Sequence, residues 1–126
     1  MIEYFNVFQH NKENVIGLLA HDIDADKFAM YIDTTRIPKQ ALLPQLFGLN
    51  QERTPDDRIL KMWIADRAIP PYRTNINEVL NYMGLDHYDA WEIMKKCNGE
   101  NPGMDYWGFV QTDTPNNNWV DQLKFE

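Results

Sequence analysis

The beginning of the chain alternates between short runs of aromatic and β-branched residues and short polar turns. Such a pattern predicts strands joined by tight connections, that is, an antiparallel β-meander. The second run is apolar on both faces, so we expect it to form the central strand. The runs are Tyr4–His10, Val15–His21 and Phe28–Asp33, and the turns between them are Asn11–Asn14 and Asp22–Asp26.

The third run alternates between two sets of side chains that would point to opposite faces of a sheet. We therefore expect one face of this strand to be buried and the other to be partly in contact with water. The inward set is Phe28, Met30 and Ile32, and the outward set is Ala29, Tyr31 and Asp33.

A helical pattern replaces the strand pattern over residues 54–97. The first helix is predicted to begin at Thr54, which can act as a hydroxyl N-cap before Pro55 and two acids, and to run to about Ala68. Its apolar stripe continues into Arg67. An arginine at the end of such a stripe either extends its guanidinium into water or meets a fixed acceptor. The apolar members of the stripe are Leu60, Trp63 and Ile64.

Two shorter helices are predicted next, each from a capping pair. Asn75 and Glu78 have the spacing of a capping box for a helix over residues 76–83, which Gly84 and Leu85 would end in a Schellman turn. The same spacing recurs for a helix from residue 90 to about 97. Its capping pair is Asp89 and Glu92, its inward side chains are Trp91 and Met94, and Asn98–Gly99 would stop it.

The remaining segments complete a single α+β domain. Between residues 34 and 53 the prolines Pro38 and Pro44 leave room only for a short helical turn. Residues 104–110 have strand composition and are expected to return to the sheet, and residues 111–126 form a tail. We therefore predict a short antiparallel β-meander, residues 1–33, packed with about three helices. The tail carries Trp119, Leu123 and Phe125, which could anchor it.

Composition and charge limit the classes of function that we expect for this chain. The 126 residues include 12 Lys and Arg against 19 Asp and Glu, a formal net charge of −7. Nucleic-acid binding is disfavoured, because a phosphate backbone prefers clustered positive charge. A single cysteine fits a reducing compartment, and the longest apolar run, Val15–Ala20, is far too short for a membrane span. We expect a cytoplasmic protein, monomeric or homodimeric.

The chain contains no motif typical of an enzyme or of a cofactor site. The segment Asp22–Asp26 with Asp33 imitates a calcium loop, but Lys27 stands where a glycine is needed and the flanks predict strands. Cys97 lies late in a predicted helix and suggests a buried thiol. We therefore expect no catalytic residue, no metal and no cofactor. The three histidines, His10, His21 and His87, lack the spacing of zinc ligands.

A rigid corner follows the first helix, because Pro70 and Pro71 restrict the residues before them. One interpretation of the residues around it is structural: Arg67 or Arg73 pairs with Asp105, and so ties the helical part to the last strand. The other is a protein-binding hot spot, since Trp, Tyr and Arg contribute most at interfaces. The candidate residues are Trp63, Arg67, Tyr72, Arg73, Asn75, Asp105, Tyr106 and Trp107.

The same stretch resembles the N-terminal region that precedes the kinase domain in HipA-like kinases. The resemblance rests on Trp63-x3-Arg67-Ala68-Ile69-Pro70-x2-Arg73, then Asn75-Ile76-x3-Leu80, then Gly84-Leu85, and finally Gly99 ahead of Asp105-x-Trp107. It is clearest over residues 63–107. The tail 119–125 resembles the short segment that leads into the kinase domain.

The resemblance implies an accessory role. In the family the catalytic residues belong to the kinase domain that follows, so none is carried over to this chain. Split HipA-like systems contain a separate small protein that binds and restrains the kinase, which implies a protein partner of toxin–antitoxin type. An alternative from another class is an acidic phage or mobile-element protein that inhibits a nucleic-acid-binding host factor by presenting carboxylates.

Overall fold

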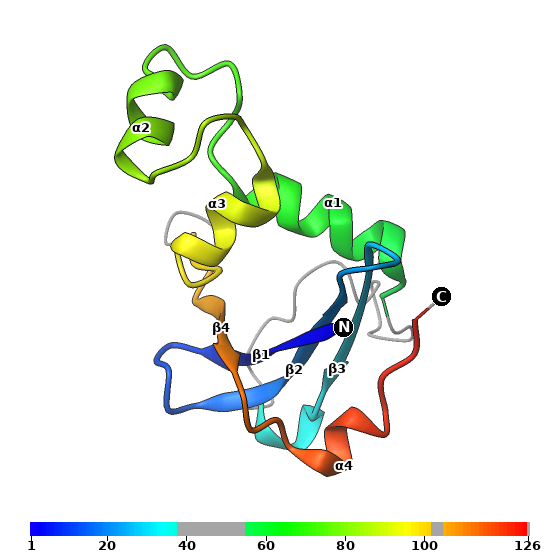
Figure 1. The fold of residues 1–126 in the computed structure, drawn as a ribbon. Helices are drawn as coiled ribbons and strands as arrows, with labels where there is room; N and C mark the ends of the chain where they lie inside the picture. Colours follow the sequence, from blue (N-terminus) through cyan, green and yellow to red (C-terminus); the bar gives the residue numbers. More distant parts are fainter. Residues whose placement is uncertain (38–54, 102–104, 126) are drawn as a thin grey trace.

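A computed structural model describes residues 1–37, 55–101 and 105–125, and it contains one four-stranded sheet (Figure 1). The strands are β1 (Ile2–Gln9), β2 (Val15–Asp22), β3 (Lys27–Ile32) and β4 (Trp107–Thr112). They lie in the order β3-β2-β1-β4, and every neighbouring pair is antiparallel. The predicted meander is confirmed, and β2 lies in the interior of the sheet as expected.

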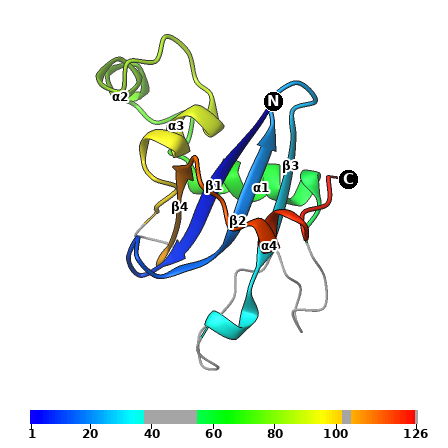
Figure 2. The same cartoon turned by 60° about the horizontal axis from the view of Figure 1, so that its bottom comes forward.

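In the described part of the chain, four α-helices accompany the sheet: α1 (Asp57–Arg67), α2 (Ile76–Tyr82), α3 (Ala90–Lys96) and the short α4 (Asn117–Val120). A 3-10 turn, η1, covers Thr34–Arg36. Helices α1 and α3 lie against one face of the sheet, whereas α2 stands apart from it in both ribbon views (Figures 1 and 2). The predicted α+β class, with three helices of at least seven residues, is confirmed.

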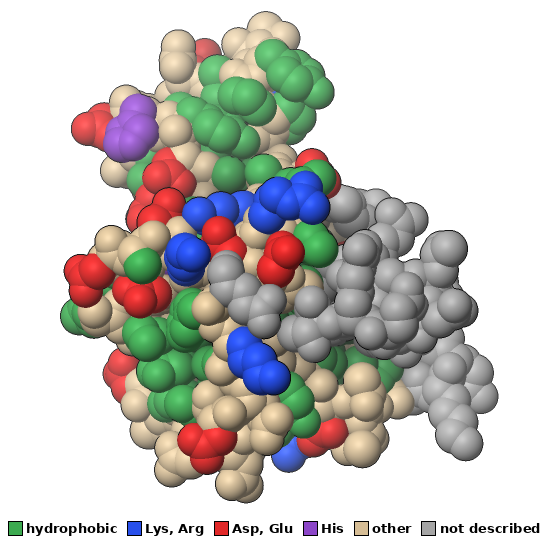
Figure 3. Space-filling model, turned by 90° about the vertical axis from the view of Figure 1, so that its right-hand side faces the viewer, with side chains coloured by type: hydrophobic (Ala, Val, Ile, Leu, Met, Phe, Trp, Pro, Cys, Tyr) green, Lys and Arg blue, Asp and Glu red, His purple; other side chains and the backbone are tan. Residues whose placement is uncertain are grey.

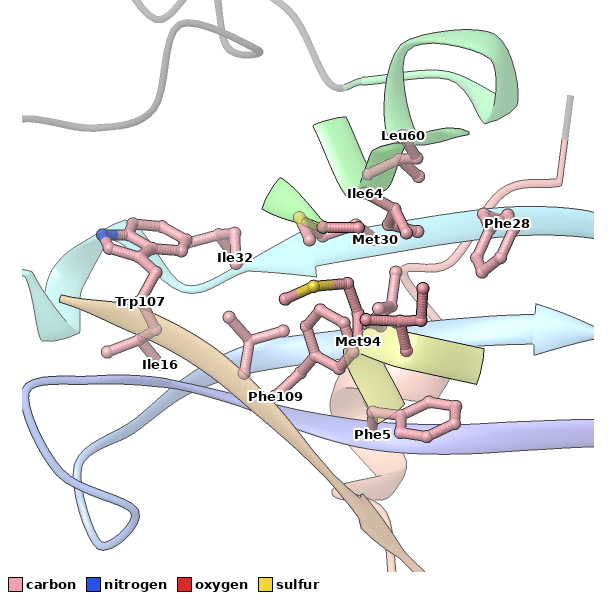
Figure 4. Packing of buried hydrophobic residues seen from close by; sticks show 14 of the residues in the cluster. Phe5, Ile16, Phe28, Met30, Ile32, Leu60, Ile64, Met94, Trp107 and Phe109 are labelled. Carbon is pink, nitrogen blue, oxygen red and sulfur yellow. The ribbon is translucent and has the colours of Figure 1, made fainter. Parts of the chain in front are cut away.

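The main core lies between the sheet and helices α1 and α3. Leu60 and Ile64 of α1 point towards Phe28 and Met30 of β3, and Met94 of α3 joins them (Figure 4). The alternation predicted for the third strand is confirmed on this side, because Phe28, Met30 and Ile32 are all buried.

The opposite face of the sheet is only partly in contact with water, as predicted for β3, and the tail covers some of it. Helix α4 packs on β2, and the buried Trp119 ring lies 6.3 Å from the ring of Tyr31. The guanidinium carbon of Arg36 also lies over the Trp119 ring, 4.7 Å from its centre. Tyr31 is therefore half-buried and Ala29 is buried. The tail is anchored through Trp119, as the sequence suggested.

Two of the element boundaries that differ from the predictions are each explained by one carboxylate. Helix α1 begins at Asp57, because the carboxylate of Asp56 accepts from the Ile59 N–H over 2.9 Å and takes the N-cap position that we assigned to Thr54. The returning strand begins at Trp107 and not at residue 104, because Asp105 accepts from the Trp107 N–H in a turn just before the ladder. Thr54 itself, the turn predicted between Pro38 and Pro44, and Met104 lie outside the described residues.

Candidate functional site

The corner after α1 is built on the side chain of Arg67, which the helical period places on the same stripe as Leu60 and Ile64. The residue is only 2% exposed. Its Nε donates to the Gly99 carbonyl over 3.0 Å, and its Nη2 donates to the Trp107 carbonyl over 2.8 Å. The guanidinium therefore meets fixed acceptors inside the protein instead of water.

An ion pair completes this arrangement. Nη1 of Arg67 donates to Oδ2 of Asp105 over 2.7 Å, and the guanidinium carbon lies 4.9 Å from the centre of the Trp63 ring. The backbone of Arg67 is held as well, since Asn101 donates to its carbonyl over 2.9 Å. The predicted pairing of an arginine with Asp105 is confirmed, and Arg67 is the partner. Arg73 is not: its Nε donates to Asn75 over 2.8 Å.

The structure divides the eight candidate residues into two groups. Arg67 and Trp107 are buried, and Trp63 and Asp105 are half-buried in the same assembly. Arg67 and Trp107 therefore cannot present their side chains to a partner in this fold, and the hot-spot interpretation does not extend to them. The exposed candidates are Tyr72, Arg73, Asn75 and Tyr106.

Tyr106 lies at the edge of the sheet, away from the other exposed candidates in sequence. The residue is 70% exposed, and its ring stacks on the His10 ring with 4.8 Å between the ring centres. The carbonyl of Tyr106 accepts from the His10 N–H over 2.8 Å, which fixes the two residues relative to each other.

The remaining exposed candidates lie in a lobe formed by residues 69–88. Its helix α2 ends as predicted: Leu85 N–H donates to the Leu80 carbonyl, and Gly84 adopts φ 77. Leu80 belongs to the buried hydrophobic cluster of the domain, and a hydrogen bond from the Tyr88 hydroxyl to the Ile69 carbonyl closes the base of the lobe. The lobe is thus an ordered part of the fold.

The capping box predicted for α2 does not form. Asn75 occupies the N-cap position, but its side chain makes no cap hydrogen bond. Its Oδ1 accepts from Arg73 instead. The helix forms nevertheless, with Leu80 buried on its inner side and its C-terminal turn intact.

The lobe presents two tyrosines to solvent. Tyr72 is 86% exposed and Tyr82 is 93% exposed. Figure 3 shows hydrophobic side chains gathered over this projecting part of the molecule. The sequence analysis missed Tyr82, although the helical period indicates that it faces outward. Tyr82 follows the inward Leu80 by two residues, so its side chain points in a direction that differs by about 200°.

Carboxylates of the acidic turn between β2 and β3 bond to groups within the protein. Asp22 accepts from the backbone N–H groups of Asp24 and Ala25, and Asp24 pairs with the N-terminal ammonium over 2.6 Å. Among the described residues, no three His, Cys, Asp or Glu side chains are arranged to hold a metal ion. Burial raises the pKa of the Cys97 thiol, which lowers its thiolate fraction and its reactivity.

Comparison of the chain with protein-family models, with curated proteins and with solved structures finds no match. Within the described ranges, no helix is both long and apolar enough to cross a membrane.

Proposed function

We propose that the protein is a non-catalytic protein-binding module that contacts its partner through the lobe of residues 69–88. The observation that carries this proposal is the exposure of Tyr72 and Tyr82 on an ordered lobe that stands apart from the sheet (Figure 1). Tyrosine contributes large contact area with few rotatable bonds, and it is enriched in binding hot spots. A partner that covers both rings removes apolar surface from water, and this burial favours the complex.

Arg73 adds a charged group to the same lobe. It is exposed, and its Nε bond to Asn75 fixes the direction of the guanidinium. A fixed guanidinium loses less conformational entropy when it pairs with a carboxylate or phosphate on a partner. The lobe therefore combines tyrosine and arginine, two of the residue types that contribute most at interfaces.

A HipA-like kinase, bound in trans, is the partner class that we propose. The support is the resemblance over residues 63–107. Four of the residues that carry it, Trp63, Arg67, Asp105 and Trp107, meet in one buried assembly beside the lobe's first residues. In this proposal the assembly holds the lobe in place and the lobe makes the contact.

The test is a calorimetric titration of the purified protein with a HipA-like kinase domain that lacks its own N-terminal region. We expect a complex, and we expect Tyr72→Ala and Tyr82→Ala each to weaken it about tenfold or more. Ile23→Ala is the matched control, because it removes an exposed apolar side chain from the turn between β2 and β3. Trp63→Ala is unsuitable, since that ring packs on Arg67 and its loss would disturb the fold.

Two results would overturn the proposal: failure of the kinase domain to bind, or equal affinity for both tyrosine variants and the wild type. Affinity that collapses with added salt and ignores both tyrosines would favour the alternative, inhibition of a nucleic-acid-binding host factor through surface carboxylates.

A further inference from the structure

A pocket of about 470 Å³ opens between the β2–β3 hairpin, helix α1 and the start of α3. Its volume falls within the range of about 300–1,000 Å³ that is usual for small-molecule sites. The lining combines an apolar part with charged and polar groups, and none of it comes from the lobe of residues 69–88. The residues that matter here are His21, Asp26, Phe28, Lys61, Ile64 and Trp91.

His21, which lines the pocket, has one ring nitrogen without a hydrogen-bond partner among the described residues. The residue is 7% exposed, and its Nε2 lies 3.0 Å from Oδ1 of Asp26. This hydrogen bond lowers the pKa of Asp26, so the carboxylate is ionised at neutral pH and can only accept. Nε2 therefore donates in this hydrogen bond, and the second ring nitrogen is Nδ1. That atom is buried and has no partner among the described residues.

Trp91 supplies an unused donor. Its Nε1 is also buried without a partner in the described part of the chain. The Trp91 ring meets His21 edge-on, with 5.4 Å between the ring centres. A buried polar group without a partner destabilises the fold, so one ligand that bonds to both nitrogens would recover free energy.

The charges around the pocket favour a cation. Four carboxylates face two ammonium groups. Lys61 is shared between Asp26 at 3.7 Å and Asp57 at 3.2 Å, and Lys95 pairs with Glu92 at 2.8 Å. Asp89, the fourth acid, accepts two backbone N–H groups and has no ion pair within the described residues. The surplus is negative, and a bound cation would neutralise part of it.

The protein already holds an alkylammonium group on part of this surface. Nζ of Lys95 lies 5.4 Å from the centre of the Trp91 ring while it pairs with Glu92. A ligand with a short methylene chain could make the same kind of contact, with its chain against Phe28 and Ile64.

We propose that this pocket binds a small organic ammonium ion that also carries an oxygen acceptor, as in an amino alcohol or an amino amide. The ammonium group pairs with Asp26 and Asp89 and donates to Nδ1 of His21, and the oxygen accepts from Nε1 of Trp91. Both nitrogens are buried in the unliganded chain, so lining side chains must shift when the ligand enters. The same chemistry is present in a free amine and in a lysine side chain beside a peptide carbonyl.

The test is a nuclear magnetic resonance titration of the whole chain with 4-aminobutan-1-ol, n-butylammonium and butan-1-ol. We expect the Trp91 indole N–H and the His21 ring nitrogens to shift most with the amino alcohol, less with the amine and not with the alcohol. Trp91→Phe identifies the indole signal. Equal shifts with neutral butan-1-ol, or no shift with the amino alcohol, would overturn the proposal. A Gly-Lys-Gly peptide shows whether a lysine side chain enters as the free amine does, and either source is consistent with the site.

Two glutamates at the third position of a helix provide a matched pair of variants. Glu92→Gln removes a charge at the pocket, whereas Glu78→Gln removes one from α2 in the lobe. Affinity for 4-aminobutan-1-ol should fall about threefold in the first and stay unchanged in the second. An equal effect of both would contradict a local site. Tyr72→Ala and Tyr82→Ala should leave amine binding intact, so failure of this proposal is distinguishable from failure of the protein-binding function.

Discussion

Arg67 donates to Asp105 over 2.7 Å, and this ion pair joins the end of α1 to the turn that leads into β4. The same guanidinium donates to the Trp107 carbonyl at the start of that edge strand. An arginine that the helical period places on an apolar stripe thus occupies a backbone acceptor of the edge strand that would otherwise be open to another chain. The corner and the sheet are therefore held as one unit by a single side chain.

Arg67→Lys should destabilise the fold by about 3 kcal/mol or more. Lysine keeps the charge but lacks the planar fork that reaches Gly99, Asp105 and Trp107 together, so buried acceptors lose their donors. The free energy of unfolding in urea measures the effect. Arg73→Lys is the control, because Arg73 is exposed and its side chain makes only one hydrogen bond, to Asn75, among the described residues. Equal stability of both variants would show that the buried fork is not needed.

A pair of glycines separates backbone strain from steric overlap. Both have positive φ, 67° at Gly99 and 77° at Gly84. A methyl group at Gly99 would overlap the buried ring of Phe109, whereas nothing lies within 4 Å of the same position at Gly84. We expect Gly99→Ala to cost about 2–4 kcal/mol and Gly84→Ala about 1 kcal/mol. Thermal unfolding followed by circular dichroism checks the order, and a larger loss at Gly84 would contradict it.

Local patterns predicted the fold well because each one depends on neighbours in the sequence. Alternation in Phe28–Asp33 indicated which side of β3 is buried, and the stripe that ends at Arg67 indicated the inner face of α1. The Schellman turn at Gly84 needs only φ and two backbone bonds within a few residues. Periodicity and turn chemistry are sufficient for such features.

The sequence did not predict which of two nearby groups would form a hydrogen bond or fill a cap position. Asn75 bonds to the side chain of Arg73 instead of its own helix, and Asp56 takes the N-cap position that Thr54 was expected to fill. The pocket at His21 was missed for a related reason. Its walls come from a hairpin and two helices that meet only in the folded chain.

The two predicted capping residues of α2 and α3 should therefore respond differently to mutation. Asp89→Ala removes a carboxylate that accepts from the Trp91 and Glu92 N–H groups, and it should cost about 1 kcal/mol. Asn75→Ala removes no cap bond and should stay within about 0.5 kcal/mol. Urea unfolding of both variants provides the comparison, and a larger loss in Asn75→Ala would contradict the observed bonding.

Acid should selectively remove the contribution that the Asp26 carboxylate makes to the free energy of unfolding. The hydrogen bond from His21, assisted by Lys61, lowers the pKa of this carboxyl below its ordinary value of 3.8. A depressed folded-state pKa means that the contribution is complete above pH 3.8 and is lost as pH falls through the lower, folded value. The difference in unfolding free energy between the wild type and Asp26→Asn should hold from pH 7 to about pH 5 and shrink below about pH 4. Asp66→Asn is the control, since Asp66 is exposed on α1 and has no ion pair among the described residues. A difference for Asp26→Asn that persists unchanged at the lowest pH would show that the carboxylate is not held by His21 in solution.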